Sequence, residues 1–140
     1  MDKEQMKNKV FEVLEKKQTG VLASVKNNKP HSRYMTFFHD DLTFYTPTSI
    51  DTHKADEVQD NPNVHVLVGY EGEGYNDPYL EIEGTATIRD DQRLKEKFWN
   101  DQMKHYFDGP NDSNYILLEI KPSLIRLMNA GEHEPQILEL

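Results

Sequence analysis

The 140-residue chain contains no cysteine, which excludes disulfides, thiol catalysis and zinc–thiolate sites. Basic residues are also scarce, since 16 Lys and Arg stand against 25 Asp and Glu for a net charge of −9. This balance opposes binding to nucleic acid, whose phosphates require clustered Lys and Arg. No apolar run approaches the length of a membrane span, and the N-terminus lacks the apolar core of a signal peptide. We therefore expect a cytoplasmic protein without nucleic-acid or membrane partners.

Hydrophobic residues make up only 36% of the sequence, and the mean hydropathy is −0.84. They are nevertheless grouped into short runs, which favours a folded chain over disorder. The length predicts a single domain, residues 1–140, that is large enough for a core of ordinary size. Apolar area buried at a subunit interface can supplement a core with so few hydrophobic residues.

Apolar spacing predicts most of the secondary structure. Residues 3–17 match an amphipathic helix, which Gly20 is suited to end in a left-handed cap. A short helix is expected within residues 51–61, and a longer one from Asp90 or Asp91 to about Phe107. Alternating or apolar runs predict strands over residues 21–25, 31–39, 42–46, 64–68, 79–88, 115–120 and 124–128.

The order of these elements indicates the fold class. Strands dominate, and most connections are too short for the crossovers that parallel strands require. We therefore predict a mainly β or α+β fold: an antiparallel barrel of six to seven strands with helices packed outside it.

The segment from Arg33 to Lys54 is the clearest candidate site. Alternation places Arg33 and Met35 on one face of a strand, and neither face of that strand is cleanly polar. Such a strand lies in a closed barrel or is covered by a planar ligand or a second subunit. Arg33 by itself is also explained as a surface arginine paired with an acidic residue.

His53 and Lys54 stand at the expected first turn of the short helix. Free backbone N–H groups and the helix dipole favour an anion there and disfavour cations. A bound anion would compensate for the two cations, although a solvated helix start explains them equally well. Together with Arg33, they could hold a phosphate-bearing cofactor against the sheet.

Other binding motifs are missing. The six histidines do not occur in a His-x-x-x-His or His-x-x-Glu-His pattern, so no metal site is predicted. The sequence contains no Gly-x-Gly-x-x-Gly motif, no P-loop and no recognisable nucleophile motif.

Several short runs occur in order along nearly the whole chain. They are Arg33-Tyr34-Met35-Thr36, Phe44-Tyr45-Thr46, His53-Lys54-Ala55, Asn61-Pro62-Asn63-Val64, Glu83-Gly84-Thr85-Ala86, Tyr106-Phe107-Asp108-Gly109 and Leu117-Leu118-Glu119-Ile120-Lys121-Pro122. Together they resemble the pyridoxamine 5′-phosphate oxidase-like split-barrel flavoproteins, and within them the general stress protein 26 group.

The resemblance implies a homodimer that binds FMN in clefts at the subunit interface. By that resemblance Arg33 and Lys54 would hold the flavin phosphate through charge-assisted hydrogen bonds, and His53 would assist them. Trp99 would approach the flavin from the second subunit.

The resemblance also assigns the rest of the cofactor site. Tyr34, Met35 and Thr36 would line the flavin ring, and Tyr45 and Thr46 would contact the ribityl-phosphate end. No general acid or base is evident, which suits chemistry carried by the cofactor, and catalytic residues are not assigned.

An oxidoreductase that passes electrons from a reduced nicotinamide to a small acceptor is the first functional hypothesis. Oxidation of pyridoxamine phosphate itself is not expected, because the sequence ends at Leu140 without the segment that contacts that substrate in the true oxidase. The alternatives are a non-catalytic flavin carrier or stress-associated binding protein, or a split barrel that binds deazaflavin or haem.

Overall fold

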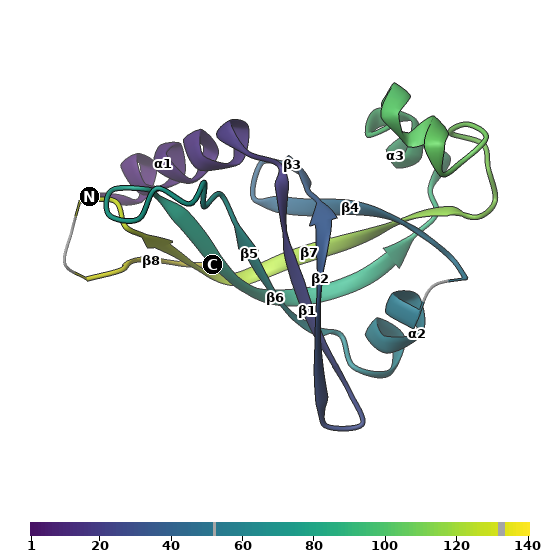
Figure 1. The fold of residues 1–140 in the computed structure, drawn as a ribbon, viewed down its shortest axis with the longest axis horizontal. Coiled ribbons are helices and arrows are strands. Elements are labelled where there is room, and N and C mark those ends of the chain that lie inside the picture. Colours follow the sequence, from purple (N-terminus) through teal and green to yellow (C-terminus); the bar gives the residue numbers. More distant parts are fainter. Residues whose placement is uncertain (52, 132–133) are drawn as a thin grey trace.

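The computed structural model describes residues 1–51, 53–131 and 134–140, with only the backbone described at residues 53 and 54. Its elements, shown in Figure 1, are α1 (Lys3–Lys16), β1 (Thr19–Lys26), β2 (Lys29–Thr36), β3 (Phe38–Asp40), β4 (Thr43–Ser49), α2 (His53–Asp60), β5 (Asn63–Val68), β6 (Tyr79–Arg89), α3 (Gln92–Lys97), the 3₁₀ helix η1 (Asp101–His105), β7 (Tyr115–Met128) and β8 (Gln136–Glu139).

Antiparallel pairing joins the strands into one curved sheet. Within the described residues the order is β2-β1-β5-β6-β7-β4-β3, and β8 pairs with β7. The long strands β6 and β7 run across the molecule, and the β1–β2 hairpin crosses in front of them and extends beyond the body (Figure 1). The predicted antiparallel barrel is confirmed, and its sheet of eight described strands exceeds the six to seven expected.

The main core lies between α1 and the sheet. The apolar positions predicted on the first helix, Met6, Val10, Val13 and Leu14, are all buried. They pack with side chains from most strands and with Val58 of α2, so the apolar stripe of α1 supplies one wall of the core. No helix in the part of the chain that the structure describes is long and apolar enough to cross a membrane.

The predicted cap at Gly20 is wrong, because this residue lies inside β1. Helix α1 ends at Lys16, and the next residue, Lys17, already has an extended backbone. A Cβ atom at Gly20 would lie 2.6 Å from the carbonyl oxygen of Leu67 on the neighbouring strand β5. Glycine is therefore required here by the close approach of two strands and not by a left-handed conformation.

Two strand boundaries also differ from the prediction. The segment 31–39 is divided at Phe37, whose side chain is buried and whose N–H donates to the Gln18 carbonyl at 2.8 Å. Conversely, residues 115–128 form one continuous strand, β7, in which Pro122 is accommodated at a bulge opposite Gly84. Bulges tolerate the missing N–H of proline, so the strand continues past it.

The long helix predicted from Asp90 or Asp91 to Phe107 is wrong. It is replaced by the short helix α3 and the separate 3₁₀ helix η1. The side chain of Asn100 accepts a hydrogen bond from the backbone N–H of Gln102 and thereby starts a new helix. Asn side chains compete with helical hydrogen bonds in this way, which explains the interruption.

Candidate functional site

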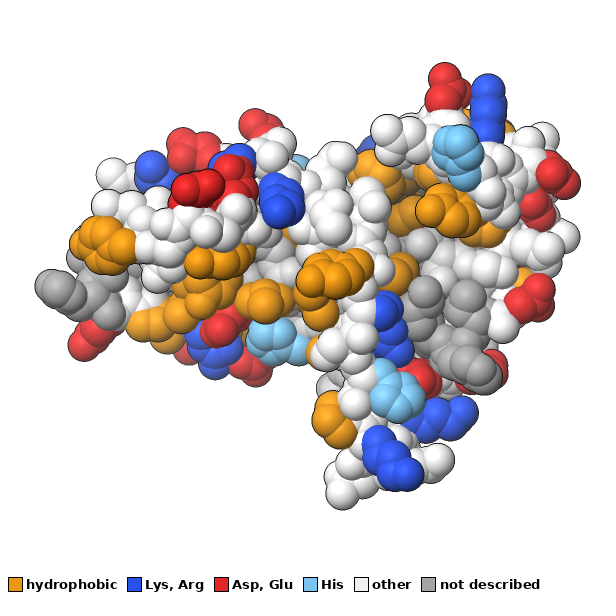
Figure 2. All heavy atoms as spheres, viewed as in Figure 1, with side chains coloured by type: hydrophobic (Ala, Val, Ile, Leu, Met, Phe, Trp, Pro, Cys, Tyr) orange, Lys and Arg blue, Asp and Glu red, His pale blue; other side chains and the backbone are white. Residues whose placement is uncertain are grey.

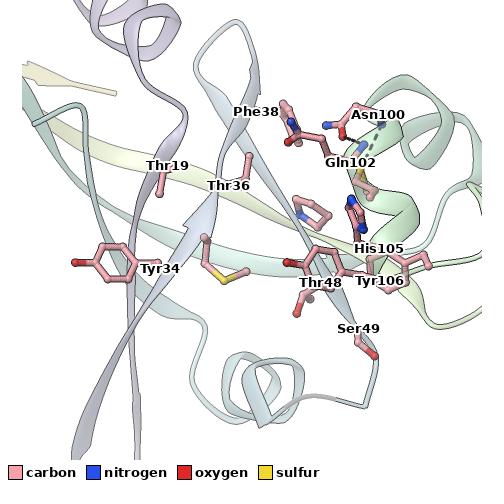
Figure 3. Close-up of a pocket in the computed structure, with 14 residues that line it drawn as sticks. Thr19, Tyr34, Thr36, Phe38, Thr48, Ser49, Asn100, Gln102, His105 and Tyr106 are labelled. Atoms are coloured by element: carbon pink, nitrogen blue, oxygen red, sulfur yellow. Dashed lines mark hydrogen bonds between the residues drawn. The ribbon is translucent and has the colours of Figure 1, made fainter. Parts of the chain in front are cut away.

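A groove of about 710 Å³ lies between β2, the end of β4 and η1 (Figure 3). Figure 2 shows the hollow, with hydrophobic side chains at its edges between the projecting hairpin and the α3–η1 region. The groove is lined by Thr19, Tyr34, Met35, Thr36, Phe38, Pro47, Thr48, Ser49, Asn100, Gln102, Met103, His105, Tyr106 and Phe107. Small-molecule sites commonly enclose about 300–1,000 Å³, so the groove suits a ligand of cofactor size.

Strand β2 contributes the three residues predicted to line a flavin ring. Tyr34, Met35 and Thr36 all border the groove. Tyr34 is 80% exposed, and Figure 3 shows its side chain pointing away from η1, whereas Met35 is buried. The groove thus brings together the predicted ring-lining residues, and it gives Tyr34 an outward position at its edge.

The opposite wall was not predicted from the sequence. It includes His105 and Tyr106 at the end of η1, and Tyr106 is 82% exposed although it lines the groove. In Figure 3 the Tyr106 side chain extends from η1 toward Thr48.

Thr48 and Ser49, at the end of β4, were also missed. Two hydroxyl residues between a strand and a helix start are a signal that could have indicated them.

Tyr45 and Thr46, predicted to contact the ribityl-phosphate end, do not line the groove and are both buried. The Tyr45 ring stacks on Phe98 with centroids 4.6 Å apart, and its hydroxyl donates to Glu119 Oε2 at 3.0 Å. Burial and this hydrogen bond raise the pKa of the Tyr45 phenol to about 12. The side chain of Tyr45 therefore stabilises the packing of α3 against the sheet.

Trp99 packs against Tyr115, on the same side of the sheet.

Arg33 lies beside the groove without lining it. Its Nη2 atom donates to Glu57 Oε2 at 2.7 Å, and its Nη1 atom donates to Ser24 Oγ at 2.8 Å and to the Leu22 carbonyl at 3.3 Å. The ion pair with an acidic residue, which was the alternative explanation of Arg33, is present.

Glu57, on α2, is the acidic partner and is only 1% exposed. Burial raises the pKa of this carboxyl, but hydrogen bonds from Ser24, Arg33 and His31 outweigh burial and lower the pKa to about 2. The carboxylate is therefore ionised at neutral pH. Sequence reasoning did not single out Glu57, because it stands in a polar segment with acidic neighbours.

Helix α2 begins at His53, four residues after the groove-lining Ser49. The helix follows β4 in the chain and packs against β1 and β6. The predicted roles of the His53 and Lys54 side chains fall outside the described residues. Across the described side chains, no three His, Asp or Glu residues are grouped closely enough to hold a metal ion.

Comparison with known sequences identifies the relatives of this chain. Residues 6–129 match the family model described as "Pyridoxamine 5'-phosphate oxidase". The chain is 54% identical over 140 residues to general stress protein 26 of Bacillus subtilis strain 168, with all of both chains covered.

Solved structures give the same result. The crystal structure of general stress protein 26 from Bacillus anthracis strain Sterne is 39% identical and superposes with a TM-score of 0.88, covering 97% of this chain and 99% of the other. A pyridoxamine 5′-phosphate oxidase-related, FMN binding protein from Nostoc punctiforme superposes with a TM-score of 0.70 over 93% of this chain and 86% of its own. At 16% identity, the second likeness shows the shared split-barrel fold alone.

Proposed function

This chain belongs to the pyridoxamine 5′-phosphate oxidase-like family, as a homologue of general stress protein 26, and we propose that it binds FMN in the groove between β2, β4 and η1. One observation carries the proposal. A groove of cofactor size runs from the predicted ring-lining strand to Ser49, close to the start of α2. A site with these two ends suits a ligand that has a planar ring and a phosphate.

The chemistry of the lining fits the two halves of FMN. Along β2, the apolar side chain of Met35 and the backbone of Tyr34 to Thr36 border the groove and would contact the ring. At the other end, Thr48 and Ser49 carry hydroxyls, and the backbone N–H groups at the start of α2 favour phosphate. In this proposal Lys54 and His53 add positive charge at the phosphate.

The remaining predicted residues take supporting parts. Tyr45 and Thr46 are buried and do not line the groove, so in this proposal they support the strand whose end carries Thr48 and Ser49. The Arg33 guanidinium is paired with Glu57 of α2, the helix whose start would receive the phosphate. A bound flavin would supply the redox chemistry, while the chain binds and orients it.

A second copy of the chain would complete the site. Tyr34, Ile50 and Tyr106 are large, exposed side chains in or beside the groove, and their exposure favours an additional protein surface over it. We therefore propose a homodimer with one groove in each subunit. Sedimentation should show a dimer, and a monomer at micromolar concentration would contradict this part of the proposal.

The absorption spectrum of the isolated protein tests the cofactor. We expect a flavin spectrum, or its appearance when FMN is added to protein that has lost the cofactor. A Soret band would favour haem instead, and no ligand spectrum under either condition would overturn the proposal. Consumption of NADH or NADPH by the FMN-loaded protein, with and without a quinone acceptor, then separates an oxidoreductase, which we propose, from a flavin carrier.

Lys54→Ala tests the phosphate end. Loss of a charge-assisted contact should weaken FMN binding by roughly 1.5–3 kcal/mol, measured by quenching of flavin fluorescence. Lys9→Ala is the matched control, because Lys9 lies on the exposed side of α1 and pairs with Glu12. Equal affinities in both variants and the wild type would argue against phosphate binding at α2.

A further inference from the structure

Glu57 is the least exposed charged residue in the part of the chain that the structure describes. A buried carboxylate is costly unless several hydrogen bonds compensate for the water it loses. The proposed function gives Glu57 no part, since its side chain does not line the groove. The hydrogen-bond donors that surround the Glu57 carboxylate indicate its role.

All three described side-chain donors to Glu57 come from the β1–β2 hairpin. Ser24 Oγ lies 2.5 Å from Oε2, Arg33 Nη2 lies 2.7 Å from the same oxygen, and His31 Nδ1 lies 2.7 Å from Oε1. Because α2 carries the carboxylate and the hairpin carries the donors, the cluster fastens the helix to the hairpin. These hydrogen bonds connect residues that are 24 to 33 positions apart in sequence.

The direction of each hydrogen bond in the cluster is fixed. An ionised carboxylate only accepts, so the Ser24 hydroxyl donates to Glu57 and is left to accept from Arg33 Nη1. The guanidinium thereby contacts Glu57 both directly and through Ser24. Two charge-assisted bonds with defined geometry hold Arg33 in one orientation.

Glu57 lies four residues after His53, which is one helical turn into α2. Figure 1 shows α2 beside the lower part of the hairpin. Fixing Glu57 therefore fixes the height and rotation of the first turn, where backbone N–H groups are available to an anion. The apolar side chain of Val58 packs α2 into the core, and the Glu57 cluster adds the directional contacts that an eight-residue helix of little intrinsic stability needs to keep one orientation.

We propose that Glu57 is a positioning residue for the phosphate of the cofactor: through Ser24 and Arg33 it holds the start of α2 in register with strand β2. This inference rests on the proposed function. The role is specific to the phosphate, since the backbone pairing of β2 with β1 holds the ring-lining residues Tyr34 to Thr36 in place.

The test compares the affinities of FMN and riboflavin, which differ by the phosphate alone. For Glu57→Gln we expect the preference for FMN over riboflavin to fall roughly tenfold, the size of effect seen when a supporting hydrogen bond to a binding group is lost. Riboflavin affinity should change much less. A purely structural role would move both affinities together and leave their ratio unchanged.

Glu119→Gln is the matched control. Glu119 is also a buried carboxylate bonded to an arginine and a hydroxyl, those of Arg89 and Tyr45, but it lies on β7, and its hydrogen bonds and ion pairs within the described residues involve no residue of α2. Its substitution should leave the ratio of the two affinities at the wild-type value. A fall in the ratio equal to that of Glu57→Gln would overturn the positioning role.

Ser24→Ala provides a second variant if Glu57→Gln does not fold. It removes the hydroxyl bridge and keeps both charges, so the ratio should fall by a smaller factor, roughly twofold to fivefold. An unchanged ratio in a folded Glu57→Gln protein, or in Ser24→Ala when the first variant is unfolded, would overturn this inference alone. A wild-type protein that binds neither flavin would instead overturn the proposed function.

Discussion

Two buried carboxylates in this molecule each accept hydrogen bonds from an arginine and a hydroxyl, but they connect different kinds of structural element. Glu57 accepts from Arg33 and from the hydroxyl of Ser24, and Glu119 accepts from Arg89 and from the hydroxyl of Tyr45. The Glu57 cluster joins a helix to a projecting hairpin. The Glu119 cluster joins β7 to β4 and β6, which are already paired to it along their backbones.

Because the elements that they connect differ, the two clusters need not contribute equally to stability and to the groove. Backbone hydrogen bonds hold the Glu119 strands together whether or not the side chains interact. Helix α2 has no such ladder to the hairpin, so its side chains must supply the specific contacts. We therefore expect substitutions in the Glu57 cluster to affect both stability and the site, and those in the Glu119 cluster to affect mainly stability.

Removal of the carboxylates should give the largest loss of stability, and the loss should differ between the two clusters. Glu57→Ala leaves Arg33 without an acidic partner in the described part of the chain, whereas after Glu119→Ala the guanidinium of Arg89 keeps two bonds to Asp91. Breaking a buried pair costs about 3–5 kcal/mol, so we expect losses of about 4 kcal/mol for Glu57→Ala and about 2 kcal/mol for Glu119→Ala. Urea denaturation at pH 7 measures both. Equal losses would mean that Asp91 does not compensate.

The sequence was sufficient to predict most strands of the sheet but not which charged side chains pair with one another. Alternation placed β5 and β6 nearly at their observed limits, because each buries one face along its length. For Arg33 the sequence left open an ion pair or an anion, since 25 acidic residues were available and none was marked as the partner. Glu57 becomes that partner only when α2 folds against the hairpin.

The second wall of the groove was unpredictable for a related reason. Residues of η1 are more than 50 positions away from β4 in sequence, and only the tertiary fold brings them beside Thr48. The wall on β2 was indicated by the resemblance to the split-barrel flavoproteins, which assigned the successive residues Tyr34 to Thr36 to the flavin ring, and these residues border the groove. The resemblance thus indicated one wall of the groove, and long-range packing supplied the other.

Acid titration of Glu57 should give the next largest change in stability. The pKa of Glu57 is lowered from 4.5 to about 2, so its stabilising contribution is present above pH 4.5 and is lost as the pH falls toward 2. The shift corresponds to roughly 3 kcal/mol. The free energy of unfolding of Glu57→Gln, measured by urea denaturation between pH 7 and 3, should therefore fall less steeply than that of the wild type. Parallel pH profiles would contradict the lowered pKa.

The Glu119 cluster should respond at the opposite end of the pH scale. The pKa of Tyr45 is raised from 10.0 to about 12 by burial and by its hydrogen bond to Glu119, so stability is present below pH 10 and is lost as the pH rises toward 12. Between pH 7 and pH 11, Tyr45→Phe should remove roughly 1 kcal/mol of this alkaline loss, at a cost of about 1 kcal/mol at pH 7 for the missing hydrogen bond. Thermal unfolding at pH 7 and pH 11 measures both effects. The phenyl ring keeps its stack on Phe98, so a larger loss at pH 7 would indicate disturbed packing.

The smallest effect is expected at an ion pair that is as short as the one between Arg33 and Glu57. Lys97 Nζ lies 2.7 Å from Asp40 Oδ2, the same distance as Arg33 Nη2 from Glu57 Oε2, but both Lys97 and Asp40 are about half exposed. Water and salt screen such a pair, and ordering its long side chain offsets much of the attraction. Asp40→Asn should therefore unfold at a urea concentration indistinguishable from that of the wild type, at low and at high salt. A clear, salt-dependent loss would show that distance outweighs burial in this protein, and the contrast between its buried and exposed acids would then require another explanation.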